Sequence, residues 1–305
     1  MSILTIDHIY KSFRTVHAVQ DLNMELSPGV IFGLLGPNGA GKTTTIRMIM
    51  DIIIPDKGKI LINGKPNSQE QLNQVGYLPE ERGLYRKMKI GELLSFFAEL
   101  KGIKPSQSKN RIKSWLERFE LIDRINKKAE ELSKGNQQKL QFIATIIHEP
   151  RLIILDEPFA GLDPVNTELI KEIMLEQQRN GATIIFSTHM MEQVEKLCDS
   201  ICLINEGKAV LSGELKQIKK RFGRNSIRME YNGEAKFLGN QKLVQKFEDH
   251  DGYVEIYPTE KVTIKQILQE AIKEVEVSRF EIMEPSLHEI FIETVTKKEK
   301  EAIHE

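Results

Sequence analysis

The sequence contains little cysteine and no long apolar run. Among its 305 residues are two cysteines, Cys198 and Cys202. Two thiols exclude a disulfide scaffold in a chain of this length, and they form a poor set of ligands for a metal. The longest apolar runs, such as 152–155, are far shorter than the ~20 residues needed to span a bilayer. Because the N-terminal residues also carry no basic segment and no cleavage site, we expect a cytoplasmic chain.

An excess of one charge is also absent. The chain has 43 lysine and arginine residues against 44 aspartate and glutamate residues, a formal net charge of −1. This balance gives no electrostatic reason to expect a nucleic-acid partner. Hydrophobic residues make up 40% and charged residues 29%, as in an ordinary globular protein, and the length suits one large domain with a smaller one.

The glycine-rich segment 36–44 carries the clearest chemical signal. It matches G-x-x-x-x-G-K-[ST], the loop that wraps the phosphates of a nucleotide, and it lies between a short apolar strand at 30–35 and a helical segment at 45–50. Its glycines permit the tight turn that points backbone N–H groups inward. Lys42 brings a cation to the outer phosphates, and the Thr43 hydroxyl can ligate Mg²⁺. The residues expected to hold the phosphates are Gly36, Pro37, Asn38, Gly39, Ala40, Gly41, Lys42, Thr43 and Thr44.

Acidic residues and a histidine follow two other predicted strands. The predicted strand 151–155, which is apolar from Leu152 on, ends in Asp156 and Glu157, and the strand 183–186 is followed by Ser-Thr and His189. Apolar strands separated by helices predict a parallel sheet, whose ligands bind at the carboxyl ends of the strands. From the residues alone, Glu157 could also be an acid that faces solvent, and His189 a histidine satisfied within the core.

Other candidates are less specific. Glu80 follows a short predicted strand, Ser133 can cap the helix after it, and Gly135 allows another backbone to approach closely. Phe13 could stack on a nucleotide base or could simply close a small sheet. A helical segment from 90 to about 124 interrupts the α/β pattern.

The pattern changes beyond Gly223. Alternating apolar and polar residues predict short strands, and amphipathic spacing predicts helices, so we expect a small α+β domain at 223–305 that ends in a charged tail. The strands are expected at 226–231, 252–257 and 280–283, and the helices at 264–275 and 286–294.

Taken in chain order, these features resemble the ATP-binding subunit of ABC transporters over residues 1–222. The matching features are the phosphate loop, Glu80, the segment 132–136, the pair Asp156 and Glu157, Asp163 and His189. The resemblance implies an α/β P-loop NTPase fold with a mostly parallel core sheet, an antiparallel β subdomain and a helical insert at about 88–148. The small C-terminal α+β domain would follow it.

The resemblance also implies an ATPase that uses Mg²⁺. Phe13 would stack on the base of ATP, and Thr43, Glu80 and Asp156 would hold the ion, Asp156 usually through water. Glu157 would polarise the attacking water.

A second subunit would complete the site. Lys42 and His189 would contact the outer phosphates within one chain. Ser133 and Gly135, in the signature loop of the family, would bind the γ-phosphate of the ATP held by the partner, and Asp163 would lie in the loop that crosses to it. Each chain would therefore hold two half-sites.

Three residues depart from the usual pattern of the family. Lys134 and Asn136 stand in a signature loop that is usually Leu-Ser-Gly-Gly-Gln, and Glu80 stands where glutamine is usual. A carboxylate can still ligate Mg²⁺ or orient water, but it cannot donate a hydrogen bond while ionised.

The segments 76–85 and 284–293 resemble the ABC-2 export group, which exports sodium, drugs or peptides. The implied partners are a second copy or a paralogous ATPase subunit and an integral membrane permease, contacted around Glu81–Lys87, at the inner face of the cell membrane. The alternative is a soluble ABC ATPase that acts on ribosomes or DNA. One cassette, no sustained heptads and a neutral charge argue against that alternative.

Overall fold

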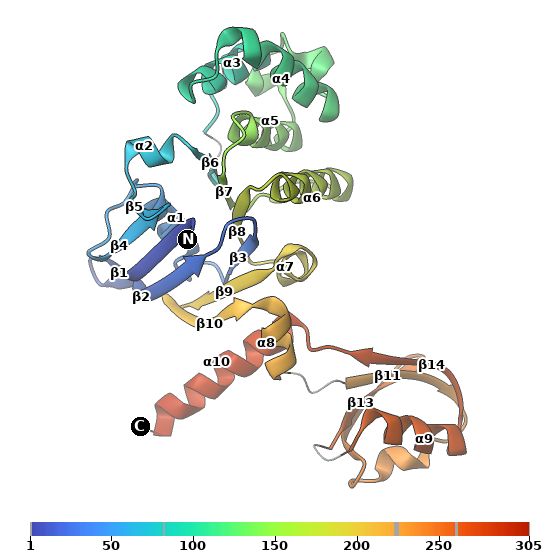
Figure 1. Cartoon of the computed structure of the whole chain (residues 1–305). Coiled ribbons are helices and arrows are strands. Elements are labelled where there is room, and N and C mark those ends of the chain that lie inside the picture. The colour runs from blue at the N-terminus through green and yellow to red at the C-terminus, as the bar shows by residue number, and fades with distance from the viewer. Residues whose placement is uncertain (1, 82, 223–225, 260–261, 305) are drawn as a thin grey trace. The chain divides into compact units, whose positions relative to one another are not determined.

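The structure, a computed structural model, describes residues 2–81, 83–222, 226–259 and 262–304 (Figure 1). The chain forms two compact units, Met1–Leu215 and Lys216–Glu305. The division falls after Leu215, whereas the sequence analysis placed the domain boundary after Phe222.

A six-stranded sheet forms the centre of the N-terminal unit. Its strands, in sheet order, are β10 (Lys208–Glu214), β9 (Ser200–Asn205), β3 (Ile31–Leu35), β8 (Thr183–Thr188), β7 (Leu152–Asp156) and β6 (Val75–Leu78). The strands from β9 to β6 run parallel, and β10 pairs antiparallel with β9. Every residue of β3, β7 and β8 is buried, as expected for strands covered on both faces. The prediction of a mostly parallel core sheet is therefore confirmed.

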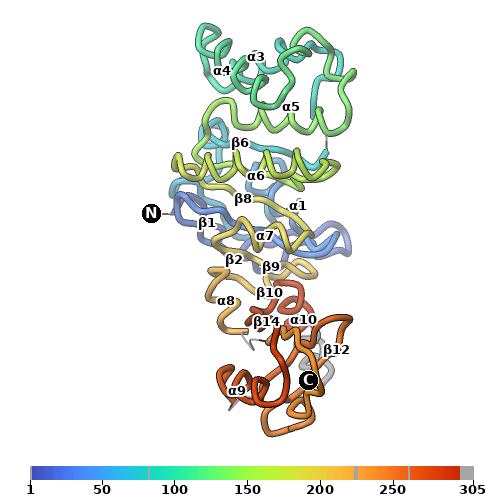
Figure 2. Tube along the Cα trace, turned by 90° about the vertical axis from the view of Figure 1, so that its right-hand side faces the viewer, coloured from blue at the N-terminus to red at the C-terminus, as the bar shows by residue number. Residues whose placement is uncertain are grey.

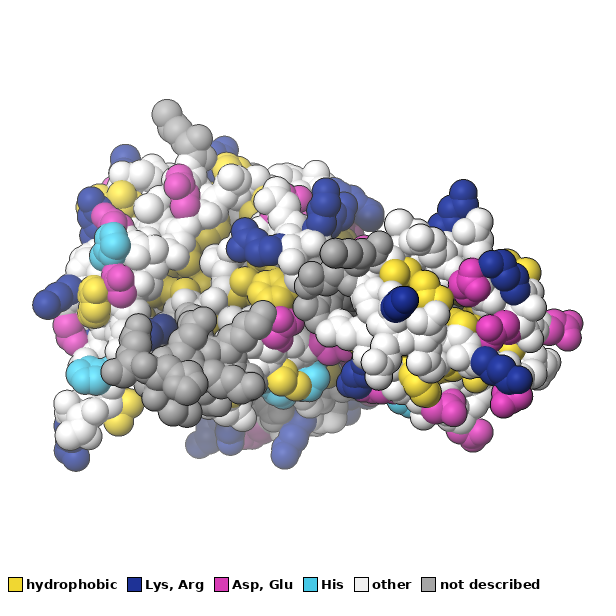
Figure 3. All heavy atoms as spheres, turned by 90° about the horizontal axis from the view of Figure 1, so that it is seen from below, with side chains coloured by type: hydrophobic (Ala, Val, Ile, Leu, Met, Phe, Trp, Pro, Cys, Tyr) yellow, Lys and Arg dark blue, Asp and Glu magenta, His cyan; other side chains and the backbone are white. Residues whose placement is uncertain are grey.

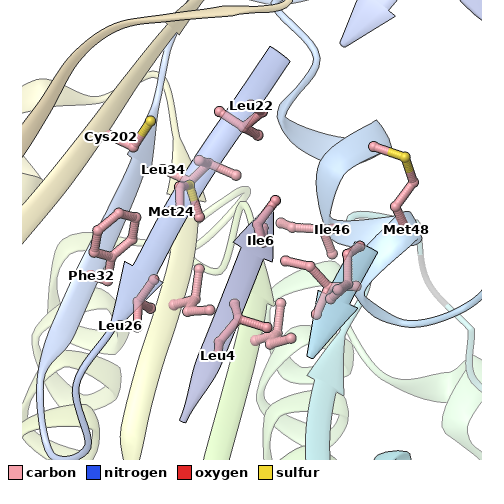
Figure 4. Close-up of a cluster of buried hydrophobic side chains, with 14 of the residues drawn as sticks. Leu4, Ile6, Leu22, Met24, Leu26, Phe32, Leu34, Ile46, Met48 and Cys202 are labelled. Carbon is pink, nitrogen blue, oxygen red and sulfur yellow. The ribbon is translucent and has the colours of Figure 1, made fainter. Parts of the chain in front are cut away.

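A second, antiparallel sheet belongs to the same unit. Its strands, in order, are β2 (Val16–Leu26), β1 (Leu4–Phe13), β4 (Lys57–Ile62) and β5 (Lys65–Pro66). Register shifts let β1 follow β2 as far as Phe13. Apolar side chains of β1, β2 and β3 and of helix α1 (Lys42–Ile49) form one buried cluster (Figure 4).

Three helices cover the other face of the six-stranded sheet. They are α5 (Lys134–Ile146), α6 (Pro164–Arg179) and α7 (Met191–Leu197). Figures 1 and 2 show them side by side across the strands, on the side away from α1. Helix α6 packs on β8, and α7 packs on β3. The sequence therefore folds into helices on one side of the sheet and a helix with a second sheet on the other.

The helical insert is divided more finely than the sequence predicts. A short helix, α2 (Gln69–Leu72), precedes β6, and the segment expected to be helical from 90 to about 124 forms α3 (Ile90–Leu100) and α4 (Pro105–Arg118). The break follows from the left-handed backbone of Gly102 (φ +81°) and from Pro105, which starts a helix well but cannot continue one. Two 3₁₀ turns, η1 (Ile122–Arg124) and η2 (Ala129–Glu131), lead to α5.

The C-terminal unit is a four-stranded antiparallel sheet with helices. The strands, in sheet order, are β12 (Val244–His250), β13 (Tyr253–Pro258), β11 (Ser226–Asn232) and β14 (Glu276–Met283). The other elements are α8 (Leu215–Phe222), η3 (Lys236–Gly239), α9 (Ile264–Glu274) and α10 (Leu287–His304). Helix α9 packs against the sheet over a core that includes Ile227, Val254, Ile256 and Ile267.

Two predictions for this unit were wrong. Strand β12 was not foreseen, because only its first residue, Val244, is buried and its pattern of alternation is weak. Helix α10 was expected to stop at Thr294 but continues to His304 through a segment rich in lysine and glutamate, which are good helix formers.

On the face drawn in Figure 3, cationic and acidic side chains are interspersed, in keeping with the near-neutral net charge.

Replacing Ile46 by alanine should lower the free energy of unfolding of the N-terminal unit by about 2–5 kcal/mol, the usual range for a buried isoleucine. Ile46 is completely buried in α1. Urea unfolding followed by circular dichroism measures the loss. Ile54, which is 74% exposed, provides the control, and Ile54→Ala should change the same quantity by less than about 0.5 kcal/mol. Equal losses in the two variants would contradict the placement of α1 in the core.

Candidate functional site

The phosphate loop joins the buried strand β3 to helix α1. Two of its positions admit only glycine. A Cβ at Gly36 (φ +150°) would lie 2.1 Å from the carbonyl oxygen of Ile204, and a Cβ at Gly41 (φ +106°) would lie 2.3 Å from that of Ala18. Gly41 also precedes the helix without a capping side chain, so the N–H groups of the first turn of α1 remain available to an anion.

Lys42 is the cation of this loop. Its side chain is buried, and Nζ donates hydrogen bonds to the carbonyl oxygens of Gly36 at 2.7 Å and Pro37 at 3.0 Å. Burial lowers the pKa of Lys42, while the nearby carboxyl groups of Glu157, Asp156 and Glu80 oppose that change. The carboxyl groups of these three acids therefore lie near the Lys42 ammonium group, beside the phosphate loop.

The parallel register of β7 and β8 places Asp156 opposite Ser187. Asp156 is buried, and its Oδ1 accepts a hydrogen bond from the Ser187 hydroxyl. Its Oδ2 is buried without a hydrogen-bond partner among the described residues. Burial raises the pKa of Asp156, and the Ser187 and Thr43 hydroxyls oppose the rise. An unsatisfied carboxylate oxygen beside a threonine hydroxyl is the kind of oxygen donor set that Mg²⁺ prefers, so these residues fit the ion.

Glu157 follows Asp156 in a left-handed conformation (φ +50°) that is uncommon for this residue type. Its Oε1 lies 2.9 Å from His189 Nδ1, and its Oε2 accepts a hydrogen bond from the Thr188 hydroxyl at 3.3 Å. The side chain of Glu157 is 14% exposed and that of His189 57%. Two contacts from the end of β8 thus fix a carboxylate at the edge of the sheet.

A cavity of about 570 Å³ lies over the phosphate loop. It brings together the loop, Glu80 and Glu157 with residues of β2 and of the turn between β9 and β10. The lining residues are Val16, His17, Ala18, Gln20, Asn38, Gly39, Ala40, Gly41, Lys42, Thr43, Thr44, Glu80, Glu157 and Glu206. Its size and its polar lining suit a nucleotide.

Phe13 lies beside this cavity at the end of β1. Its ring is 45% exposed, and Lys11 Nζ is 5.6 Å from the ring centroid. Val16, its partner on β2, lines the cavity. An exposed ring at this position is free to receive a flat base.

Ser133, Gly135 and Asp163 do not line the cavity. Ser133 Oγ accepts a hydrogen bond from the Asn136 backbone N–H at 3.3 Å and so caps α5, as predicted. Asp163 caps α6 by accepting from the Asn166 N–H at 2.9 Å, an interaction that lowers the pKa of Asp163. The starts of both helices therefore lie apart from the phosphates that this chain can bind.

Sequence reasoning missed several residues of the site. Gln20, His17 and Glu206 line the cavity, and the Ser187 and Thr188 hydroxyls hold the two acids. The Ser-Thr pair next to His189 was a usable signal, because it ends a strand that lies beside the acidic one. The turn of Glu206 offered no such signal, since only the folded sheet brings it to the loop.

Fold and site together define a P-loop nucleoside triphosphatase. Residues 19–160 match the family described as ABC transporter, and residues 213–295 match the family described as ATP-binding protein DrrA1-3-like, C-terminal domain. The chain belongs to the ABC transporter ATP-binding proteins, and its relatives place it in the ABC-2 export group.

Two relatives and one solved structure illustrate the likeness. The uncharacterized ABC transporter ATP-binding protein YhaQ of Bacillus subtilis (strain 168) is 44% identical over 297 residues, which are 96% of this chain and 98% of that protein. The linearmycin resistance ATP-binding protein LnrL of the same organism is 34% identical over 228 residues, 74% of this chain and 73% of that protein. A structure described as the ATP binding subunit of an ABC transporter aligns with a TM-score of 0.69 and 32% identity, over 73% of this chain and 94% of that one.

Membership in this family establishes the general activity of the chain. The chain binds ATP and hydrolyses it as a subunit of a transporter, and subunits of this family work as dimers with membrane permease components. Within the described part of the chain, we find no helix with the length and apolar character of a membrane span.

Replacing Gly41 by alanine should lower the affinity for ATP by more than about tenfold, because the new Cβ forces the loop away from Ala18 and displaces its N–H groups. Gly29→Ala is the control. Gly29 shares the positive φ (+76°) but has no atom within 4 Å of the added Cβ. Titration with a fluorescent ATP analogue compares the two variants. Unchanged affinity in Gly41→Ala would contradict the close fit of the loop.

Replacing Asp156 by asparagine should stabilise the nucleotide-free protein at neutral pH. The raised pKa of Asp156 means that the folded state disfavours its charged form, so stability is lost as pH rises from 3.8 through the folded pKa. Asparagine cannot ionise, so the variant does not lose this stability. At acidic pH, where Asp156 is protonated, the two proteins should be equally stable. Thermal unfolding of both proteins between pH 4 and 8 measures the difference.

Replacing Asp163 by asparagine should have the opposite effect and lower the thermal stability at neutral pH, because the pKa of Asp163 is lowered. The same thermal unfolding measurements between pH 4 and 8 test it. The carboxylate of Asp163 stabilises the fold above pH 3.8, and that stability is lost as pH falls through the folded pKa. Asparagine also caps helices well, so this variant isolates the charge. For Asp156→Asn, a gain in thermal stability that does not change with pH would show that burial of the charged carboxylate is not its cause.

Proposed function

We propose that two copies of this chain, or one copy and a paralogous ATPase subunit, close on two ATP molecules and drive export through a separate membrane permease. The proposal rests on the observation that the expected site residues fall into two groups that lie apart in one chain. The phosphate loop, Glu80 and Glu157 share one cavity, whereas Ser133 and Gly135 lie at the exposed start of α5, outside it. A second chain can bring that helix start to the open side of the cavity.

Within one chain, the phosphate loop and Lys42 hold the β- and γ-phosphates. Thr43 and Asp156, with Glu80 beside them, would hold Mg²⁺, which would neutralise charge on the phosphate oxygens. The buried Asp156 Oδ2, unpaired among the described residues, supports this assignment. Phe13 holds the base from the other end of the cavity.

Glu157 polarises the water that attacks the γ-phosphate. His189 and Thr188 contact its two carboxylate oxygens, which fixes the direction in which the remaining lone pairs point. Because an ionised carboxylate accepts but does not donate, Nδ1 of His189 carries the proton in this pair. Nε2 then faces away from Glu157, and it reaches the γ-phosphate as a donor only when the ring is protonated at both nitrogens.

The partner chain completes the site with Ser133, Gly135 and Asp163. The N–H groups at the start of α5 can donate hydrogen bonds to the oxygens of the γ-phosphate. Nothing crowds the α-carbon of Gly135, since an added Cβ would meet its nearest neighbours only at 3.8 Å, an ordinary van der Waals distance. A phosphate oxygen can therefore approach this backbone closely.

The permease contact lies around Glu81–Lys87, of which Arg82 is outside the described residues. A groove of about 330 Å³ with a mainly apolar lining includes Gly83 and Leu84 from this segment, together with Phe97 and Leu100 of α3. Tyr85 is 54% exposed and packs edge-on against Phe96, with ring centroids 5.4 Å apart. An apolar groove beside an exposed tyrosine suits a protein partner, which would hold the ATPase at the inner face of the membrane.

The exported substrate is an ion, a drug or a peptide, in line with the ABC-2 export group. The domain at 223–305, which overlaps the match to residues 213–295, acts as an accessory domain that regulates the dimer. None of the comparisons favours the ribosome or DNA alternative.

Replacing Glu157 by glutamine should reduce ATP hydrolysis by at least about a hundredfold, the usual contribution of a positioned base, and leave ATP binding intact. The variant should also accumulate as an ATP-bound dimer, because the closed state is no longer released by hydrolysis. Phosphate release and size-exclusion chromatography with ATP and Mg²⁺ measure the two effects.

Glu25→Gln removes a carboxylate from an exposed position of β2 that does not line the cavity. It should keep the rate of the unaltered protein and show no trapped dimer. A Glu157→Gln variant that retains most of its ATPase rate would rule out Glu157 as the base. A variant that is inactive but stays monomeric with ATP would rule out the closed dimer.

A further inference from the structure

The turn between β9 and β10 has an unexpected residue. Glu206 and Gly207 form a two-residue connection in which both residues have positive φ, +48° and +77°. This hairpin geometry favours Asn-Gly or Asp-Gly, because asparagine and aspartate tolerate the left-handed region better than glutamate does. The chain follows that rule at the turn between β4 and β5, where Asn63 (φ +52°) precedes Gly64 (φ +74°). Turn formation alone therefore does not explain Glu206.

Backbone hydrogen bonds hold this turn against the nucleotide cavity. The Gly207 N–H donates to the carbonyl oxygen of Ala40 in the phosphate loop at 3.0 Å, and the Gln20 N–H donates to that of Gly207 at 2.8 Å. The Gln20 side chain donates to the carbonyl oxygen of Glu206 at 2.9 Å. Because a Cβ at Gly207 would lie 2.9 Å from the carbonyl oxygens of both His17 and Ala18, the turn is wedged between β2 and the loop.

The carboxylate of Glu206 is free to bind a ligand. Glu206 lines the cavity and is exposed, and it has no side-chain hydrogen bond or ion pair with any residue that the structure describes. A strained backbone that presents an unpaired charge to a binding cavity points to function rather than to folding.

The position of Glu206 defines the part of ATP that it can reach. Lys42 and Thr43 mark the phosphate end of the cavity, and Val16, beside Phe13, marks the base end. The β9–β10 turn contacts both Ala40 and the start of β2, so it lies between the two ends. With phosphates at one end and the base at the other, the ribose occupies the middle.

We propose that Glu206 is a specificity-determining residue that accepts hydrogen bonds from the 2′- and 3′-hydroxyls of the ribose. A carboxylate repels phosphates but accepts O–H donors, and the ribose diol is the group of ATP that offers them. The same pairing of an acid with ribose hydroxyls occurs in dinucleotide-binding folds. The inference rests on the placement of ATP in the proposed function.

Nucleotide binding to Glu206→Asn tests the proposal. The unaltered chain should bind ATP about tenfold more tightly than 2′-deoxy-ATP or 3′-deoxy-ATP, the effect of one hydrogen bond to a charged group. In the variant, ATP and both deoxy analogues should bind with about equal affinity, because the carboxylate that accepts from either hydroxyl is gone. ATP, which loses both hydrogen bonds, should weaken more than each analogue, which loses one. Calorimetric titration with EDTA present prevents hydrolysis. Asparagine suits the turn, so the melting temperature should stay the same or rise.

Asn63→Glu is the matched control, because it places glutamate in the same backbone conformation away from the nucleotide cavity. It should leave the preference for ribose unchanged. A Glu206→Asn variant that keeps the preference would overturn the proposal, and so would an unaltered chain that binds ATP and both deoxy analogues equally. Either result leaves the proposed function standing. Failure of the unaltered chain to bind any of these nucleotides would instead refute the proposed function.

Discussion

The register of three parallel strands is the constraint on which the site depends. Strand β8 pairs with β3 on one side and with β7 on the other, so that Thr188 lies opposite Leu35 and Ser187 opposite Asp156. The phosphate loop, the two acids and His189 leave these strands at the same edge. A slip of one residue would turn alternate side chains to the opposite face, which would separate Asp156 from the Ser187 hydroxyl. The fully buried strands resist such a slip, because their apolar side chains fit one register on both faces.

Local pattern predicted the parts of this arrangement that depend on neighbours in sequence. The apolar runs gave the parallel sheet, the glycine pattern with its flanking strand and helix gave the loop, and Ser133 was foreseen as a helix cap. The parts that depend on long-range pairing were not accessible. Gln20 and Glu206 lie 186 positions apart in the chain but share a hydrogen bond, and no local signal marks either residue. The pairing that carries β1 as far as Phe13 likewise depends on register shifts against β2, which no local pattern indicates.

Several groups of the site are unfavourable for folding. Burial works against the charge of Lys42 and of Asp156, and Glu157 and Glu206 both hold left-handed conformations that suit other residue types. Each of them faces or borders the nucleotide cavity. The surrounding strands and the apolar cluster of β1, β2, β3 and α1 hold the backbone in place despite these costs. Left-handed glutamates also occur away from the cavity, at Glu120 and Glu149. At the cavity, however, a ligand can compensate both the strain and the buried charge.

Two of these side chains already have hydrogen-bond partners elsewhere in the chain. Lys42 donates to the carbonyl oxygens of Gly36 and Pro37, and Glu157 is held by His189 and Thr188. A phosphate must compete with these contacts, so part of its binding energy goes into replacing them. The cavity of one chain is therefore ordered but incomplete as a catalytic site. In the proposed dimer, the helix start at Ser133 of a second copy would supply donors that the described residues of this chain do not bring to their own cavity. In the dimer that we propose, hydrolysis would depend on dimerisation, because the phosphate must displace contacts within one chain and would gain new donors from the other.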